Sequence, residues 1–314
     1  MVAAPFRSAV HFPAEAKPNT SMASFRRISI LLFDSATPKF DNGLMPLLTD
    51  LSDPSDWVEP DDVPRPVVAY GMASVDVGSL ELELHRHAKG QVLLIQNGAL
   101  SCEVQGGLWV VPPRSAVWIP CGALHAIKAT GALEGYSAFI APDAATSLPS
   151  GCCTISVTPL LRELLLRAAR LPLLYEEGGA NSRLMALLLD EIAVAKVEDL
   201  HLPMPTDVRL REMVNLMMAS PGDRGTLDVW AKRVGLSERT LLRLISRETG
   251  MSFGRWRQQL AIVLAVKRLA DGASIQQVAN DLGYESVPSF VTMFRKALGT
   301  PPGRYMAERH SGRH

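Results

Sequence analysis

The feature that most constrains this chain is a helical unit that occurs twice between Thr226 and Tyr305. In each copy, apolar residues recur at i, i+3, i+4 and i+7, a glycine breaks the helix, and a serine precedes a second amphipathic helix. The two apolar faces consist of Leu227, Trp230, Ala231 and Val234, and of Ile275, Val278, Ala279 and Leu282. The breaking glycines, Gly235 and Gly283, lie 48 residues apart. This duplication predicts an all-helical C-terminal part.

Two short helices joined by a tight glycine turn predict a helix-turn-helix, whose second helix can lie in the major groove of DNA. Ala231 and Ala279 each stand four residues before the turn glycine, where a small side chain lets the helices cross closely. A plain helical bundle is the alternative, since amphipathic helix pairs are common. Two copies with matching alanine, glycine and serine favour the DNA-binding interpretation.

Residues 226–305 resemble the tandem helix-turn-helix domain of the AraC/XylS transcription regulators. The closing signature of that family is visible from Gly283 to Tyr305 as GYESVPSFVTMFRKALGTPPGRY. In that family a long helix joins the units, so that one chain contacts two successive major grooves. Here the connector is predicted over 253–269, with a length of about 25 Å. The resemblance implies a DNA-binding domain over 206–310.

The start of each second helix should face the bases. In the first unit the exposed register holds Arg239, Leu242 and Arg243. Arg239 is the predicted base reader, because a guanidinium can form bidentate hydrogen bonds with guanine. Ordinary solvent-exposed positions are the alternative interpretation for each of these residues.

The second unit carries shorter side chains in the same registers, namely Pro288, Ser289 and Thr292. These residues offer little direct readout, so weaker base discrimination is expected there. Arg295 and Lys296 follow on the same helix and are predicted to contact phosphate or to remain solvated.

The net charge of the 314 residues is zero, but the charges are unevenly distributed. From Asp207 onward there are 17 Lys and Arg against 10 Asp and Glu, whereas the preceding part has 15 against 22. The basic C-terminal part would therefore supply a salt-dependent attraction for phosphate.

The N-terminal part divides into three predicted regions, 1–64, 65–145 and 146–205. Residues 1–64 are rich in proline and small polar residues, which predicts a poorly ordered arm, and Met22 is an alternative start to Met1. In 65–145 the apolar period changes to two, and short strands are separated by glycine and proline, which predicts a jelly-roll or cupin barrel. The fold class is therefore α+β: a barrel and a helical pair, followed by the all-α tandem domain.

A second set of chemically informative residues lies in the predicted barrel. Residues i and i+2 of a strand share a face, so His85 and His87 can both enter the interior, where His125 can join them. The pattern resembles the cupin motifs, in which two histidines, a glutamate and a third histidine bind a divalent metal. Gln91 occupies the glutamate position, and a neutral amide is a weaker ligand.

Three interpretations of these histidines remain open. They bind one divalent metal ion, they line a metal-free pocket for an organic effector, or they only form hydrogen bonds within the core. Leu93, Trp109 and Trp118 would suit a partly hydrophobic effector, if they face inward.

Two leucine-rich helices are predicted at 160–170 and 182–196, and the prolines of 202–205 indicate a hinge. The region 146–205 resembles the dimerising helices of the family, which implies a homodimer. Packing of both helices within one chain is the alternative.

Cys102, Cys121, Cys152 and Cys153 lack paired metal-ligand spacing, so reduced, mostly buried thiols are expected. The sequence has no run of 18 apolar residues and no secretory signal. A cytoplasmic protein without a membrane partner is therefore expected.

The whole layout resembles the AraC branch whose cupin carries an HxH segment and a VVPPxxAVWIP segment. In this sequence the two segments are His85–His87 and Val110–Pro120. The resemblance implies a small-molecule effector, control of a nearby transporter or efflux gene, and RNA polymerase as a partner if the protein activates. The expected function is a ligand-responsive transcription regulator and not an enzyme. The alternatives are a metal-dependent cupin enzyme with a DNA-binding appendage, and an architectural DNA binder with a vestigial pocket.

Overall fold

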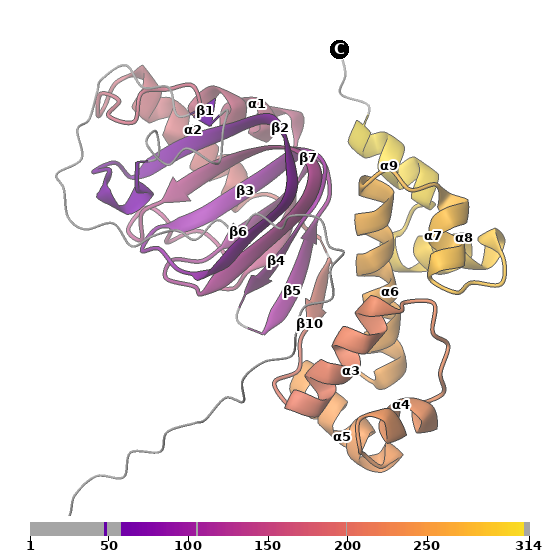
Figure 1. The fold of residues 1–314 in the computed structure, drawn as a ribbon. Coiled ribbons are helices and arrows are strands. Elements are labelled where there is room, and N and C mark those ends of the chain that lie inside the picture. Colours follow the sequence, from indigo (N-terminus) through magenta and orange to yellow (C-terminus); the bar gives the residue numbers. More distant parts are fainter. Residues whose placement is uncertain (1–46, 49–57, 105, 199, 311–314) are drawn as a thin grey trace, which may run out of the picture.

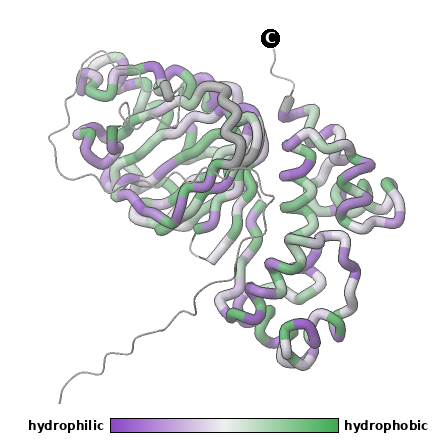
Figure 2. The backbone as a smooth tube through the Cα atoms, in the orientation of Figure 1, coloured by the Kyte–Doolittle hydropathy of each residue, from purple (hydrophilic) through white to green (hydrophobic). Residues whose placement is uncertain are grey.

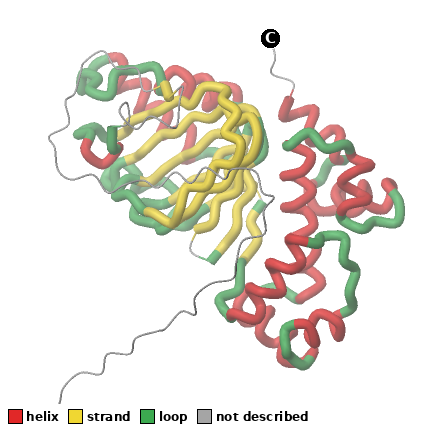
Figure 3. Tube along the Cα trace, viewed as in Figure 1, coloured by secondary structure: helices red, strands yellow, loops and turns green. Residues whose placement is uncertain are grey.

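In the computed structural model of this protein, residues 47–48, 58–104, 106–198 and 200–310 are described. Over these residues the chain has a β-rich N-terminal part and a helical C-terminal part, which confirms the α+β expectation (Figures 1 and 3). Most of the predicted arm, 1–46 and 49–57, lies outside the described residues, as does Met22. Within the described ranges, none of the helices is long and apolar enough to cross a membrane.

The β-rich part is one sheet with a short 3-10 helix, η2 (Pro60–Asp62), before its first long strand. Its strands are β1 (Leu47–Leu48), β2 (Val67–His85), β3 (Gly90–Asn97), β4 (Leu100–Val104), β5 (Gly107–Val111), β6 (Ser115–Ile119), β7 (His125–Ile140), β8 (Cys153–Ser156), β9 (Val197–Glu198) and β10 (His201–Pro203). The first half of β7 pairs with β4 and its second half with β3, while β2 runs antiparallel along its other side. The sheet therefore divides at β7 into two wings that enclose a core (Figure 1).

Successive side chains of β3 alternate between that core and the outer face of the sheet. Leu93 and Ile95 belong to the interior cluster, whereas Val92 and Leu94 pack outside it beneath two helices. These are the predicted leucine-rich helices, α1 (Pro159–Ala168) and α2 (Ala180–Ala193). Thr158 caps α1 by accepting a hydrogen bond from the Leu161 amide at 3.1 Å. Burial of one face on the sheet confirms packing within the chain.

The segment after α2 differs from the expected hinge. β10 pairs with β5, with Leu202 opposite Leu108, and the Leu202 side chain is fully buried. β9 pairs with β8 at the other end of the sheet. The sequence did not indicate these strands, because two- and three-residue strands show no alternation of their own. They tie 197–198 and 201–203 into the sheet, and Pro203 ends an edge strand.

The C-terminal part contains helices only, over the residues that are described. They are α3 (Val208–Ala219), α4 (Leu227–Arg233), α5 (Glu238–Thr249), α6 (Phe253–Ala270), α7 (Ile275–Asp281), α8 (Val287–Leu298) and α9 (Pro302–His310). The predicted repeat is confirmed, because α4 and α7 have 7 residues each and α5 and α8 have 12 each. The connector α6 has 18 residues, and hydrophobic positions follow its length (Figure 2).

The two parts meet along β5 and β10. Leu200 and Leu202 enter the same buried cluster as Trp256 of α6, and the Trp256 indole donates to the Pro203 carbonyl at 2.8 Å. Arg309 of α9 pairs with Glu198 of β9 at 2.5 Å. The strand β10, which links the two parts, therefore also packs against the helical part.

Candidate nucleic-acid interface and histidine site

The first unit presents one face of α5 to solvent. Ser237 caps the helix by accepting a hydrogen bond from the Thr240 amide at 3.3 Å, and Gly250 ends it in the left-handed conformation with φ of 68°. Leu241, Leu244 and Ile245 are buried. The predicted contact residues on the opposite face, Arg239, Leu242 and Arg243, are all exposed.

The second unit repeats this construction with other side chains. Ser286 accepts from the Ser289 amide at 3.4 Å, and Gly299 ends α8 with φ of 80°. Phe290 and Phe294 are fully buried. The predicted contact positions are exposed, and they are Pro288, Ser289, Thr292 and Lys296.

Both second helices stand clear of the sheet. The helix α6 packs on β5 and β10, and ion pairs add contacts from α3 and from α9, namely Arg211 with Glu103 and Arg309 with Glu198. The helices α7 and α8 lie on the far side of α6, and α4 and α5 lie near its lower end (Figure 1). Arg239 and Arg243 are therefore accessible without any movement of the barrel.

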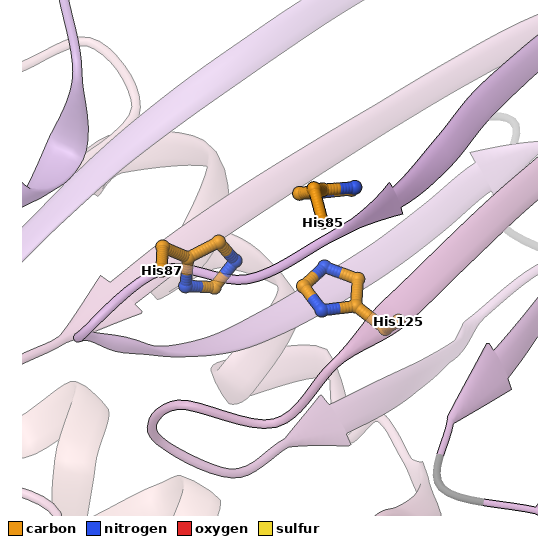
Figure 4. A group of neighbouring side chains, drawn as sticks. All are labelled: His85, His87 and His125. Atoms are coloured by element: carbon orange, nitrogen blue, oxygen red, sulfur yellow. The ribbon is translucent and has the colours of Figure 1, made fainter. Parts of the chain in front are cut away.

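The three predicted histidines converge at one end of the barrel (Figure 4). His85 ends β2, His125 begins β7 directly opposite, and His87 lies in the turn before β3. One ring nitrogen from each lies within 4.8 Å of the others. His125 is fully buried, whereas His85 and His87 are half-buried.

Backbone carbonyls orient each imidazole. The Nδ1 atoms lie 2.7 Å, 2.5 Å and 2.9 Å from the carbonyl oxygens of Glu83, Lys89 and Ala123, for His85, His87 and His125 respectively. Nδ1 therefore donates in each ring, and Nε2 remains for another partner. The buried Nε2 of His125 has no hydrogen-bond partner. This arrangement, with one nitrogen held by a carbonyl and the other free, is typical of metal-binding histidines.

Burial keeps two of the rings neutral. Burial, together with a smaller contribution from the neighbouring charges of His85 and His87, lowers the pKa of His125 to about 4. Burial also lowers the pKa of His85, with a smaller contribution from His87. A neutral imidazole is the form that binds a metal, so His85 and His125 are already in the metal-binding form at neutral pH.

Gln91, at the position of the cupin glutamate, belongs to the cluster. It is 6% exposed, its Oε1 lies 3.3 Å from His87 Nε2, and its amide group donates to Ser137 Oγ at 3.0 Å. With Nδ1 of His87 donating to a carbonyl, Nε2 and the Gln91 oxygen are both acceptors, so Gln91 places a second potential ligand atom beside the nitrogen that a metal would use.

The sequence analysis missed two residues that hold the histidine turn. The Asp61 carboxylate accepts from the amides of Ala88 and Lys89, at 2.5 Å and 2.9 Å. The buried Lys89 ammonium in turn donates to the carbonyls of Pro60 and Val63, both at 2.6 Å. The proline at the start of a short acidic turn was the available signal, but it was included in the predicted arm.

Only part of the predicted apolar lining faces inward. Leu93 and Trp109 belong to the interior cluster, and the Trp109 ring stacks on His201 at 4.4 Å. Trp118 packs in the outer cluster beneath α1 and α2, and its indole donates to the Pro149 carbonyl at 2.7 Å. The suggestion that Trp118 lines a pocket is wrong. Trp118 lies opposite Val92 in the ladder, and Leu93, the next residue of β3, lies opposite Val117. Successive side chains of a strand point to opposite faces, so Trp118 points outward with Val92 while Leu93 points inward.

Comparisons with known proteins agree with this architecture. A family described as "Helix-turn-helix domain" matches residues 230–308. The HTH-type transcriptional regulator NimR of Escherichia coli (strain K12) is 42% identical over 251 residues, covering 79% of this chain and 90% of that protein. This chain belongs to the AraC/XylS family of transcription regulators. Its helical C-terminal part is accordingly a DNA-binding domain.

More distant relatives match less of the chain or superpose loosely. The HTH-type transcriptional regulator RipA of Corynebacterium glutamicum is 32% identical over 103 residues, or 33% of this chain and 31% of that protein. ToxT from Vibrio cholerae, with unsaturated fatty acid bound, is 13% identical with a TM-score of 0.33, covering 77% of this chain and 94% of its own. A superposition this loose adds nothing to the family assignment.

Proposed function

We propose that this regulator responds to an effector in its barrel and places α5 and α8 in two successive major grooves of one duplex. The observation that carries the proposal is the pair of matching helix-turn-helix units on one connector, with both second helices exposed and clear of the sheet. In this division, 206–310 reads DNA, 65–145 senses, 146–205 dimerises, and 1–64 is an arm whose residues 60–63 are fixed to the histidine turn.

The proposed contacts differ between the units. Arg239 and Arg243 carry donors that reach base edges, and Leu242 can contact a thymine methyl group. In the second unit, Pro288, Ser289 and Thr292 approach the groove with little hydrogen-bonding capacity, while Lys296 neutralises phosphate. Sequence preference should therefore be concentrated in the half-site under α5.

Selection of bound sequences from a pool of random duplexes, with the full chain, tests this assignment. Two boxes one helical turn apart are expected, and the box under α5 should be the better defined. Recovery of no sequence preference at all would contradict the DNA-reading function.

The proposed sensor is the histidine cluster. Its three convergent nitrogens, with Nδ1 held by carbonyls and the His125 Nε2 without a partner, support either one divalent metal or direct contact with an organic effector. A bound ion would supply a Lewis-acidic position to an oxygen or nitrogen of the effector. His85, His87 and His125 would hold it, with Gln91 beside His87.

Titration with Zn²⁺ against a chromogenic chelator distinguishes these two forms of sensor. If the site binds metal, Gln91→Glu should tighten binding by about tenfold, because it restores a carboxylate. His85→Ala with His87→Ala should abolish binding, whereas Arg86→Ala is the matched control, because Arg86 is exposed on the same turn.

If no metal binds, a metabolite library screened by thermal shift should yield a stabiliser that the double histidine variant no longer recognises. If the double histidine variant kept both the Zn²⁺ binding and the stabiliser binding of the wild type, the proposed sensor would be contradicted. If the histidine cluster is the sensor, the double variant should lose its response to the effector while it still binds DNA.

We assign sensing and not catalysis to this site, because a neutral amide stands where cupin enzymes carry a carboxylate. An oxygen-uptake screen with metal-loaded protein tests the assignment, and turnover of any substrate would support the enzyme alternative. Control of a transporter or efflux gene, and contact with RNA polymerase during activation, are further proposals that operator mapping and in vitro transcription would test.

The proposed homodimer uses the outer faces of α1 and α2. Leu160 and Leu187 remain 49% and 43% exposed after these helices pack on the sheet. Sedimentation of the full chain should show a dimer that Leu187→Asp weakens. A monomeric wild-type protein at micromolar concentration would contradict it.

A further inference from the structure

The loop between α3 and α4, residues 220–225, touches the other helix-turn-helix unit. It precedes the first unit in the chain, yet Arg224 extends to Gly283 and Tyr284 in the turn between α7 and α8. The Arg224 Nε donates to the Gly283 carbonyl at 3.0 Å, and the guanidinium lies 4.4 Å from the centroid of the Tyr284 ring. The loop therefore bridges the two units at the turn that orients α8.

The backbones of the loop and the turn are also in direct contact. A Cβ on Gly283 would lie 2.5 Å from the Gly222 carbonyl oxygen, and a Cβ on Gly222 would lie 2.9 Å from the Asp281 carbonyl oxygen. The equivalent turn glycine of the first unit, Gly235, has open space within 4 Å of such a Cβ. Gly235 and Gly283 both adopt positive φ, so the close approach at Gly283 is an additional requirement that the repeat does not impose.

The connector helix holds the other end of the loop. Arg257 of α6 donates to the carbonyls of Asp223 and Gly225, at 2.6 Å and 2.9 Å. The Asp223 carboxylate pairs with Arg233 of α4 at 2.5 Å. The loop is thus fixed to α4, to α6 and to the turn of the second unit at once.

One buried apolar cluster runs from the first unit through α6 to the second unit, and the loop lies at its edge. A cavity of about 210 Å³ lies there, and Arg224, Arg257, Tyr284, Met217 and Leu264 are among the residues that line it. Arg224 and Arg257 border this cavity, and the polar contacts of the loop add a directional restraint to the apolar join.

We propose that residues 220–225 form a strut that fixes the spacing and rotation between α5 and α8, with Arg224 as its positioning residue. The inference rests on the proposed reading of two successive grooves. A strut of this kind determines which distance between the two DNA boxes the protein accepts, while no residue of the strut needs to contact a base.

The physical consequence concerns the second box. One inserted base pair moves that box by about 3.4 Å and turns it by about 35°. A fixed pair of helices cannot follow this change, so binding falls toward that of a single box. A loosely joined pair can follow it, but it binds the original spacing less tightly because more freedom is lost on binding.

The test uses the full chain and the two-box duplex recovered by selection, together with versions that carry one inserted base pair or a scrambled second box. Wild type should lose about tenfold or more in affinity on insertion. Arg224→Ala should bind the original duplex about threefold to tenfold more weakly, and its insertion penalty should shrink to less than about threefold. Affinity for the duplex with one box should be unchanged.

Two further variants separate positioning from charge. Arg224→Lys keeps the positive charge but loses the planar guanidinium, so it should behave like Arg224→Ala. Arg304→Ala removes an exposed arginine that pairs with Glu308 on α9, and it should keep the full insertion penalty. Because Arg224 is exposed, its variants should fold, and Gly222→Ala provides a second route to the same loosening.

An unchanged insertion penalty in both Arg224→Ala and Gly222→Ala would overturn the strut while leaving DNA reading intact. A wild-type protein that selects no sequence would instead remove the proposed function and the strut with it. A wild type that selects two boxes but tolerates insertion would also overturn the strut, because it would show that the units are not held at one spacing.

Discussion

The two helix-turn-helix units have the same backbone plan but different surfaces and cores. Both second helices begin at a serine cap and end at a left-handed glycine. The α5 core is aliphatic, whereas the α8 core is a chain of aromatic rings that runs from Tyr284 through Phe290 and Phe294 to Tyr305, with centroids 5.4 to 5.8 Å apart. Their exposed faces also differ, because arginines at α5 correspond to proline and threonine at α8.

The two units differ in the features that suit base discrimination and positioning on DNA, although they share one helical plan. The first unit presents arginines on the exposed face of α5, whereas the second unit has an aromatic core. The strut contacts both units, through Arg233 of α4 and through the turn between α7 and α8. In the proposed function, the second unit would serve mainly to position the protein, and the first mainly to discriminate between sequences.

The largest expected effect concerns the cores. Phe294→Ala should destabilise the second unit by about 3–5 kcal/mol, and Ile245→Ala the first unit by about 2–5 kcal/mol, because each leaves a cavity. Amide hydrogen exchange on α5 and α8 would measure the opening of each unit separately. Equal loss of protection in both helices for either variant would show that the two units open as one.

The next effect concerns base reading. Arg239→Ala should weaken specific binding by about 1–3 kcal/mol and relax the preference at one base position. Thr292→Ala, in the second unit, should cost less than about 0.5 kcal/mol. Affinity measurements on the selected duplex and its single-base variants provide the check, and a larger loss for Thr292→Ala would reverse the proposed roles.

The caps should show no such asymmetry. Ser237→Ala and Ser286→Ala should each reduce stability by about 1 kcal/mol, since each hydroxyl satisfies one amide at a helix start. Thermal unfolding, with hydrogen exchange to locate the change, would measure both. If only one of the two variants lost stability, the two caps would contribute unequally despite their matching geometry.

The smallest effect concerns phosphate contact. Lys296→Ala should weaken binding similarly for all sequences, and the slope of log K against log salt should become shallower by about 1. Titrations at several salt concentrations give the slope. An altered base preference with an unchanged slope would instead assign Lys296 to the groove.

Much of this site could be predicted from patterns that are local in the chain. The spacing of Leu241, Leu244 and Ile245 determines which face of α5 is buried, and so which face carries Arg239 and Arg243. His85 and His87 lie close together as predicted, but the reason differs, because β2 ends at His85 and His87 lies in the turn that follows. Only the convergence of His125 needed the cupin resemblance, because strand pairing between residues 40 positions apart has no local signal.

Other features depended on contacts that no local pattern encodes. The burial of Leu202 requires β5 beside it, and the outward direction of Trp118 requires the register between β3 and β6. The clamp of Asp61 on the amides of Ala88 and Lys89 joins segments that the sequence assigned to different regions.

By itself, the sequence determined that this chain carries two matched helix pairs, a strand-rich sensor region and three histidines able to meet. Helix periodicity and capping act over a few residues, so they can be recognised without knowing the fold. Tertiary structure alone decided that the linker is an edge strand, that carbonyls orient the imidazoles, and that Gly222 touches Gly283. These depend on distances between segments far apart in the chain, and such distances are set only when the whole core packs.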